Sequence, residues 1–347
     1  MIQGQSFVMK QNKSRVLWID IARGIGLMSV FIAHLRIPFA SAWMHTFAMP
    51  LFFFLSGLLY PGCKKYSFGR FAWMRFKRLV IPYFTLGSVI ALFYCLVYAW
   101  YGEPSSTYLN MLRSFLIQEH YWTIWFLAAL YLAQLLYYAI DWCFNRWRGA
   151  VSIASLALCL FGFARYRLGY GSLPWNLDVA FVAQFFFHLG YQFMHMDKVR
   201  EWFVAPMPKI RLAGILLVCL IMNVVAAKAC IMFSGHSLDM SMGLYGNEFM
   251  TMVSAIAGIL LIVTMASVIH SRFFTYLGQN TMILFAWHSR IVIVACGLIY
   301  AHFGLFQAPG IETSLLRATV SLIAILVILI PINELIKRLP CHTLFGV

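Results

Sequence analysis

The sequence has few charged residues for its length. Only 11% of its 347 residues are charged, whereas about 25% is usual for a water-soluble globular chain. Hydrophobic residues make up 62%, including 31 phenylalanines and 11 tryptophans. A soluble fold of this size cannot hide so much apolar surface, because much of any folded surface stays in contact with water. We therefore expect an integral membrane protein.

Acidic residues are scarcer still, with 11 Asp and Glu against 26 Lys and Arg, for a formal net charge of +15. Such an excess is compatible with nucleic-acid binding. In a membrane protein, however, basic residues gather on the cytoplasmic side, beside anionic lipid. We therefore expect no nucleic-acid partner.

The eight cysteines form no CxxC pair, and most fall inside apolar runs. This spacing fits neither a disulfide framework nor a zinc site. We expect them to be packing residues, and we expect no metal.

Long polar connections and internal repeats are also lacking, which predicts a single membrane domain. A spanning helix needs about 20 mostly apolar residues, and about ten segments meet that length. The expected fold is an all-α polytopic bundle, with a retained first helix in place of a cleaved signal peptide. The expected spans are 16–36, 42–60, 80–101, 122–142, 150–165, 177–196, 211–233, 247–270, 279–301 and 316–337.

The basic residues predict how these spans are oriented. With the N-terminus in the cytoplasm, eighteen Lys and Arg fall in inner segments and three within spans. Five fall outside, namely Arg36, Arg113, Arg165, Arg167 and Arg317. This strong bias follows the positive-inside rule and places both termini in the cytoplasm. We expect cytoplasmic tails at 1–15 and 339–347 around a membrane domain at 16–338.

The first span carries three ionisable residues, Asp20, Arg23 and His34. At about 100° per residue they share one helical stripe, with Arg23 about 16 Å below His34. The simpler interpretation is that Asp20 and Arg23 form a structural ion pair and that His34 is a packing residue. Charged groups in lipid are costly, however, so three on one stripe favour a functional path. A histidine is suited to take a proton from an attacking hydroxyl group.

The segment after the second span, CKKYSFGRFAWMRFKRLVIPY, contains six basic residues. Arg75 and Arg78 are three residues apart, so on a helix they project together and can clamp phosphate groups. Trp73 or Phe76 is placed to stack on a purine. The alternative is an ordinary basic loop on anionic lipid.

Further polar residues lie within the expected spans, and we list His45, Asp178, Glu248 and His288 as possible cavity-lining residues. His188 and Arg290 are embedded as well. Taken singly, each is more often structural than functional.

Several segments together resemble the acyltransferase 3 family of bacterial membrane O-acyltransferases, which includes fucose-4-O-acetylase-like and surface-polysaccharide acetylases. The clearest are WIDIARGIGLMSVFIAHL, MPLFFFLSGLLY and RFKRLVIPY, and the likeness continues through YLGQNTMILFAWHS over nearly the whole chain. In one departure, the family often has a histidine directly before Met-Pro in the second span, where this chain has Ala48. His45 lies one helical turn earlier.

The resemblance implies transfer of an acyl group, with acetyl expected, from cytoplasmic acetyl-CoA to a hydroxyl of a cell-surface or lipid-linked carbohydrate. It implies that His34 and Arg23 belong to the catalytic motif, to which we add Asp20, and that Arg75 and Arg78 engage the acyl-CoA. It also implies a multi-pass protein of the bacterial inner (cytoplasmic) membrane.

Two roles for His34 stay open at this point, namely deprotonating the acceptor and carrying the acyl group itself. The alternative functions are a glycolipid or polysaccharide transporter or flippase without acyl transfer, and a polyprenyl-sugar-dependent glycosyltransferase. Missing inverted repeats count against the transporter, and the lack of acidic residues in the first outer loop counts against the glycosyltransferase.

Overall fold

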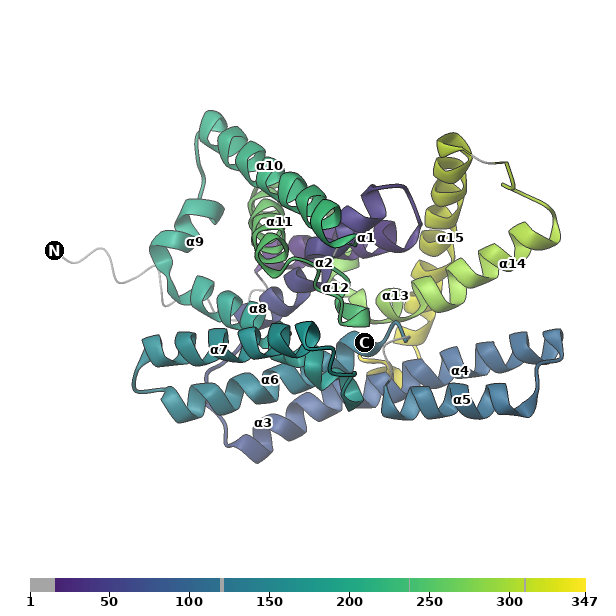
Figure 1. The fold of residues 1–347 in the computed structure, drawn as a ribbon, viewed down its shortest axis with the longest axis horizontal. Coiled ribbons are helices and arrows are strands. Elements are labelled where there is room, and N and C mark those ends of the chain that lie inside the picture. The colour runs from purple at the N-terminus through teal and green to yellow at the C-terminus, as the bar shows by residue number, and fades with distance from the viewer. Residues whose placement is uncertain (1–15, 119–121, 237, 309) are drawn as a thin grey trace.

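The computed structural model describes residues 16–118, 122–236, 238–308 and 310–347 (Figure 1). Over these ranges the regular structure is helical, apart from one isolated antiparallel bridge between Asp239 and Leu244. The expected all-α class is confirmed. The predicted cytoplasmic tail at 1–15 lies outside the described residues.

Nine helices among the described residues are long and apolar enough to cross a membrane, and they coincide with nine of the ten expected spans. The chain is thus a multi-pass membrane protein. These helices are α1 Leu17–His34, α2 Ala40–Leu58, the continuous helix Phe68–Tyr101, α6 Trp125–Phe144, α7 Arg148–Arg167, α10 Lys209–Ser234, α11 Glu248–Val268, the continuous helix Thr281–His302, and α15 Ile311–Lys337.

The tenth expected span, 177–196, forms helix α8 Leu177–His195 but is not among these nine. Its sequence includes Gln184, His188 and Gln192, which lower its hydropathy. Gln184 and His188 are buried, and the Gln184 amide donates to the Ser155 carbonyl on α7 at 2.7 Å. The bundle tolerates these polar groups because α8 packs against α2, α6 and α7 and presents little surface to lipid.

The basic segment lies outside the expected spans, yet it is helical from Phe68 onward. It forms α3 Phe68–Arg75 and the π-helix η1 Phe76–Val80, which continue into α4 Ile81–Tyr101. The continuous helix Thr281–His302 also contains a π-helical stretch. Its parts are α13 Thr281–Trp287, η4 His288–Ile293 and α14 Val294–His302.

Shorter helices that were not expected connect the long ones. The amphipathic α5 Ser105–Ile117 folds back along α4, where an outer loop was expected. The others are α9 Asp197–Val204, α12 Arg272–Gln279, η2 Pro174–Asn176, η3 Met240–Met242 and η5 His342–Phe345. Within the 339–347 tail, the Leu344 carbonyl accepts from the Thr85 hydroxyl at 2.5 Å, so this segment packs on the start of α4.

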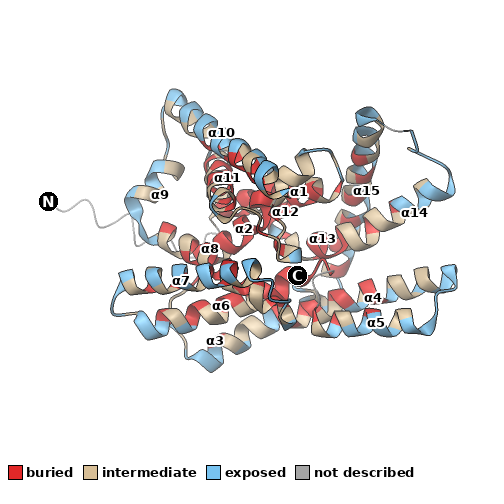
Figure 2. Cartoon of the chain, in the orientation of Figure 1, coloured by how far each residue is buried: buried red, intermediate tan, exposed pale blue. Residues whose placement is uncertain are grey.

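Helices α1 and α2 lie at the centre of the bundle and are mostly buried, whereas α10 and α15 present exposed faces on its outside (Figure 2). Those faces carry large apolar residues such as Val225 and Val327, as expected for contact with lipid.

Helix α1 also contacts α12 backbone to backbone. A Cβ on Gly24 would lie 2.0 Å from the Phe274 oxygen, and one on Gly278 1.7 Å from the Asp20 oxygen. Only glycine allows this approach.

Candidate functional site

Three histidines from three segments meet at the end of α1. The His34 ring centroid lies 5.4 Å from that of His45 on α2 and 4.8 Å from that of His288 in η4. We call these residues the histidine cluster. His288 is fully buried, while His34 and His45 are half-buried. The structure thus brings together three of the residues selected from the sequence.

Hydrogen bonds determine which nitrogen of His34 carries a proton. Its Nδ1 lies 2.9 Å from the Val30 carbonyl oxygen, which only accepts, so Nδ1 is protonated. His288 Nδ1 likewise donates to the Phe285 carbonyl at 2.7 Å. The unprotonated His288 Nε2 therefore faces His34 Nδ1–H at 3.4 Å. In the neutral ring, His34 Nε2 keeps its lone pair for a ligand.

A small cavity of about 20 Å³ adjoins the three histidines, and we call it the histidine cavity. Ala48, Asp239 and Phe285 also line it. Ala48 occupies the position at which the related family often has a histidine. His45, one helical turn earlier, places its imidazole ring at the same cavity.

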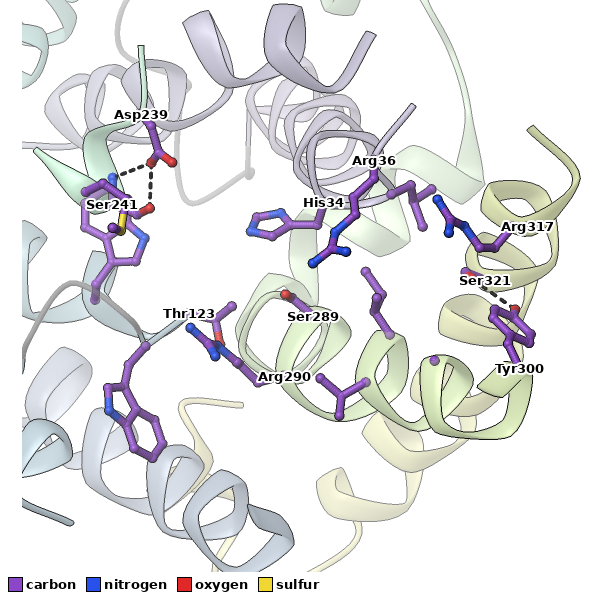
Figure 3. A pocket seen from close by; sticks show the side chains of 17 residues that line it. His34, Arg36, Thr123, Asp239, Ser241, Ser289, Arg290, Tyr300, Arg317 and Ser321 are labelled. Carbon is purple, nitrogen blue, oxygen red and sulfur yellow. Dashed lines mark hydrogen bonds between the residues drawn. The ribbon is translucent and has the colours of Figure 1, made fainter. Parts of the chain in front are cut away.

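The orientation predicted from the basic residues places Arg75 and Arg78 at the cytoplasmic end of the bundle, which we call the inner end. We call the opposite end the outer end. An outer cavity of about 520 Å³ shares His34, Thr123, Asp239 and other residues with the histidine cavity. Arg36 and Arg317 enter it from the end of α1 and from α15, and Arg290 reaches in from η4 (Figure 3). Asp239 accepts from the Ser241 amide at 2.9 Å.

An inner cavity of about 220 Å³ contains the arginines selected from the sequence. Arg23, Arg75 and Arg78 all line it, although they come from α1, α3 and η1. Arg75 Nε is buried without a hydrogen-bond partner among the described residues, and its guanidinium group lies 5.1 Å from the Phe71 ring centroid. Trp73, which is exposed, stacks on Phe76 nearby.

Asp20 lies in the first turn of α1 and does not line the inner, outer or histidine cavity. Its carboxylate is buried, accepts from the Gln279 amide at 2.9 Å and lies 3.9 Å from Arg23. Asp20 is therefore placed to orient Arg23, and it does not face the histidine cavity.

Three aromatic rings line the inner cavity, and one of them also lines the histidine cavity. Phe52, Phe126 and Phe285 have ring centroids 5.5–6.4 Å apart. We call these residues the phenylalanine triad. Phe285 also lines the histidine cavity, so the two cavities share this residue.

Two of the possible cavity-lining residues do not line the cavities around His34. Glu248 forms a bidentate ion pair with Arg167. Asp178 lines a separate cavity of about 340 Å³, whose lining does not include His34. Both are polar groups at helix ends that satisfy local partners, which position in the sequence alone does not reveal.

Other residues of the site were not selected as site residues from the sequence. Arg36 and Arg317 were counted only as outer charges, and Asp239 and Gln134 carried no motif. Both π-helices fall at the site, since η1 carries Arg78 and η4 carries His288 and Arg290. Such helices often occur at functional sites because the extra residue per turn redirects side chains.

Comparison with known families identifies the family of the chain. A model described as an acyltransferase domain matches residues 16–334. The chain belongs to the acyltransferase 3 family. Family membership implies acyltransferase activity and an acyl donor. No curated protein and no solved structure matches the chain.

Proposed function

We propose that this acyltransferase 3 protein transfers an acetyl group from cytoplasmic acetyl-CoA to a carbohydrate hydroxyl at the outer face of a bacterial inner membrane. The observation that carries the proposal is the position of His34. Its unprotonated Nε2 belongs to a ring that lines both the outer and the histidine cavities, and the histidine cavity shares Phe285 with the inner cavity that three arginines line.

The inner cavity suits the charged part of acyl-CoA. Arg23, Arg75 and Arg78 offer forked donors to phosphate oxygens, and the buried Arg75 Nε has a donor to spare. At about 220 Å³ the cavity is smaller than the roughly 300–1,000 Å³ that encloses a whole drug-sized ligand. The adenine would then lie at the surface, where Trp73 is exposed and stacks on Phe76 beside Lys77.

Gln134 on α6 supports the same assignment. It lines the inner cavity, is only 4% exposed, and its side-chain oxygen has no hydrogen-bond partner among the described residues. A buried polar group normally finds a partner, since leaving it unpaired is costly. An amide N–H of the pantetheine arm would provide the missing donor.

The size of the histidine cavity favours a short acyl group. Its volume of about 20 Å³ is little more than the roughly 10–15 Å³ needed to hold one water molecule. The two-carbon acetyl group fits with small adjustments, whereas a long acyl chain would have to displace Phe285. This supports acetyl as the transferred group.

His34 would act as a general base toward the acceptor. Its Nε2 takes the hydroxyl proton while that oxygen attacks the thioester carbonyl carbon, and the carbon–sulfur bond then breaks. The leaving thiolate of coenzyme A recovers the proton from the imidazolium ring. His288 and the Val30 carbonyl hold Nδ1–H in place throughout, which keeps the reactive tautomer.

Purified protein in proteoliposomes tests this function with [¹⁴C]acetyl-CoA on one side and a surface glycan on the other. We expect label on the glycan only when the acetyl-CoA faces the inner end. Label that never reaches carbohydrate from either side would refute the proposal. A rapid acid quench without glycan tests direct transfer, because label retained on His34 would show an acyl-histidine intermediate instead.

A further inference from the structure

The outer cavity concentrates positive charge on the side where basic residues are scarce. Of the five basic residues assigned to outer segments, Arg36 and Arg317 both line this cavity, and the span residue Arg290 joins them. The positive-inside rule disfavours arginine at this face. Their concentration around one cavity therefore calls for a specific ligand.

These arginines have no acidic partner in the described parts of the chain. No Asp or Glu there forms an ion pair with Arg36, Arg290 or Arg317, although Arg290 Nη1 contacts the Tyr94 hydroxyl at 3.5 Å. Like charges around one cavity repel each other unless an anion joins them. By contrast, the outer Arg167 is paired with Glu248.

One carboxylate, that of Asp239, also lines the cavity, so its wall carries three positive charges and one negative. Asp239 Oδ1 accepts from the amide and hydroxyl groups of Ser241, and Asp239 borders the histidine cavity too. A carboxylate beside His34 is suited to accept from a sugar hydroxyl, while the arginines suit an anion. The two features describe different parts of one ligand.

We propose that the acceptor is an anionic glycan, whose phosphate or carboxylate group binds Arg36, Arg290 and Arg317 while its hydroxyl reaches His34. The cavity volume of about 520 Å³ accommodates a sugar with its charged group. This inference rests on the proposed function for the identity of the hydroxyl, but the anion site itself is testable by binding alone.

The binding test uses inorganic pyrophosphate and full-length protein in nanodiscs. An Arg75→Gln/Arg78→Gln background weakens inner anion binding and leaves only Arg23 there, so that differences between outer-site variants in ³¹P NMR or calorimetry report the outer site. Arg317→Gln and Arg36→Gln should each raise the dissociation constant roughly tenfold or more, the effect of losing one charged hydrogen bond. Arg113→Gln, an exposed outer arginine on α5 that does not line the cavity, should leave it unchanged.

Acceptor assays with the arginine pair Arg75 and Arg78 intact then separate the two sources of the anion. Methyl glucuronide supplies a carboxylate, a prenyl-diphosphate-linked glucose supplies phosphates, and methyl glucoside is the neutral reference. We expect one anionic acceptor to be preferred over methyl glucoside, and Arg317→Gln to reduce that preference roughly tenfold.

The outcomes distinguish this inference from the proposed function. Pyrophosphate binding that weakens in Arg36→Gln and Arg317→Gln supports the anion site even if no acyl transfer is detected. Unchanged binding in both variants overturns the anion site even if transfer occurs. Equal use of methyl glucoside and both anionic acceptors by the wild-type protein would overturn it as well.

Discussion

His34 and His188 are both embedded in the helical bundle, yet their surroundings differ. His188 is buried in α8, and both of its ring nitrogens are engaged, one by the Tyr137 hydroxyl at 3.1 Å and the other by Ser152 Oγ at 3.0 Å. Among the described residues His34 forms hydrogen bonds only through Nδ1, and it lines two cavities. A histidine with both nitrogens satisfied inside the protein holds helices together, whereas a histidine with one free nitrogen beside a cavity can act on a ligand.

The residues around each histidine extend this contrast. Near His188, Tyr60, Tyr138 and Asp141 form a packed polar network in which Asp141 accepts from the Tyr60 hydroxyl at 3.0 Å. We call these residues, together with Cys63, Tyr137 and His188, the tyrosine network. The polar groups of the site instead line cavities, and Arg75 Nε and Gln134 Oε1 in the inner cavity have no partner among the described residues.

The largest expected effect comes from removing the His34 ring. His34→Ala should lower kcat by roughly 10²–10⁴-fold, the usual contribution of a general base, because His45 and His288 do not line the outer cavity as His34 does. The measurement is acetyl transfer from labelled acetyl-CoA by purified protein. Transfer at the wild-type rate by a correctly inserted variant would remove His34 from the mechanism.

His188→Leu is the matched substitution in the tyrosine network. Losing this ring leaves the buried Tyr137 hydroxyl without a partner among the described residues, at about 1–3 kcal/mol. Ser152 keeps its contacts with the Arg148 carbonyl and Gln192. We expect a lower unfolding temperature and an unchanged kcat per folded molecule. A large loss of kcat without loss of stability would show that the contrast between the two histidines is wrong.

The next largest effect is expected at the inner cavity, where Arg75 is the residue to change. Arg75→Ala should raise the KM for acetyl-CoA about ten- to hundredfold with little change in kcat, since a charged hydrogen bond to phosphate is lost. Arg75→Lys should restore only part of it, because lysine lacks the forked geometry. Arg70 on the same helix is the control, since it lies over the Tyr66 ring and does not line the cavity. An unchanged KM in Arg75→Ala would refute the phosphate contact.

Gln134→Leu should separate stability from activity. Replacing an unpaired buried amide by an apolar side chain of similar size should not lower the unfolding temperature. The KM for acetyl-CoA should nevertheless rise about two- to tenfold, the value of one neutral hydrogen bond. A destabilised protein with normal KM would instead mean that Gln134 has a purely structural role.

The fold was largely predictable because membrane spans carry a local signal. An apolar run of about 20 residues shows in the sequence whatever it packs against, and nine of the expected spans coincide with such helices. The basic segment at 63–78 lies outside the expected spans because basic residues lower hydropathy without preventing a helix. Its helix packs through α3 and η1 against α6, which involves residues distant in sequence.

The candidate site was predictable only in part, for the same reason. Arg23, His34 and the Arg75 and Arg78 pair lie in recognisable segments, and the structure places them around connected cavities. Arg36 and Arg317 are separated by most of the chain and meet only after folding. The π-helices that orient Arg78 and His288 carry no composition that distinguishes them from α-helices.

The smallest expected effect concerns Cys63, which belongs to the tyrosine network. Its backbone N–H donates to Asp141 at 2.9 Å, and burial together with the Asp141 charge raises the pKa of its thiol from 9.0 to about 11. At pH 7 only about one thiol in ten thousand is then a thiolate, so maleimide should label the exposed Cys341 and leave Cys63 unmodified. Because the folded state holds this proton more tightly, the thiol's contribution to stability is complete below pH 9 and is lost as the pH rises through about 11. Mass spectrometry of labelled peptides checks the expected labelling of Cys341 and the expected protection of Cys63. Rapid labelling of Cys63 at pH 7 would mean that the tyrosine network is open to solvent, as the cavities around His34 are.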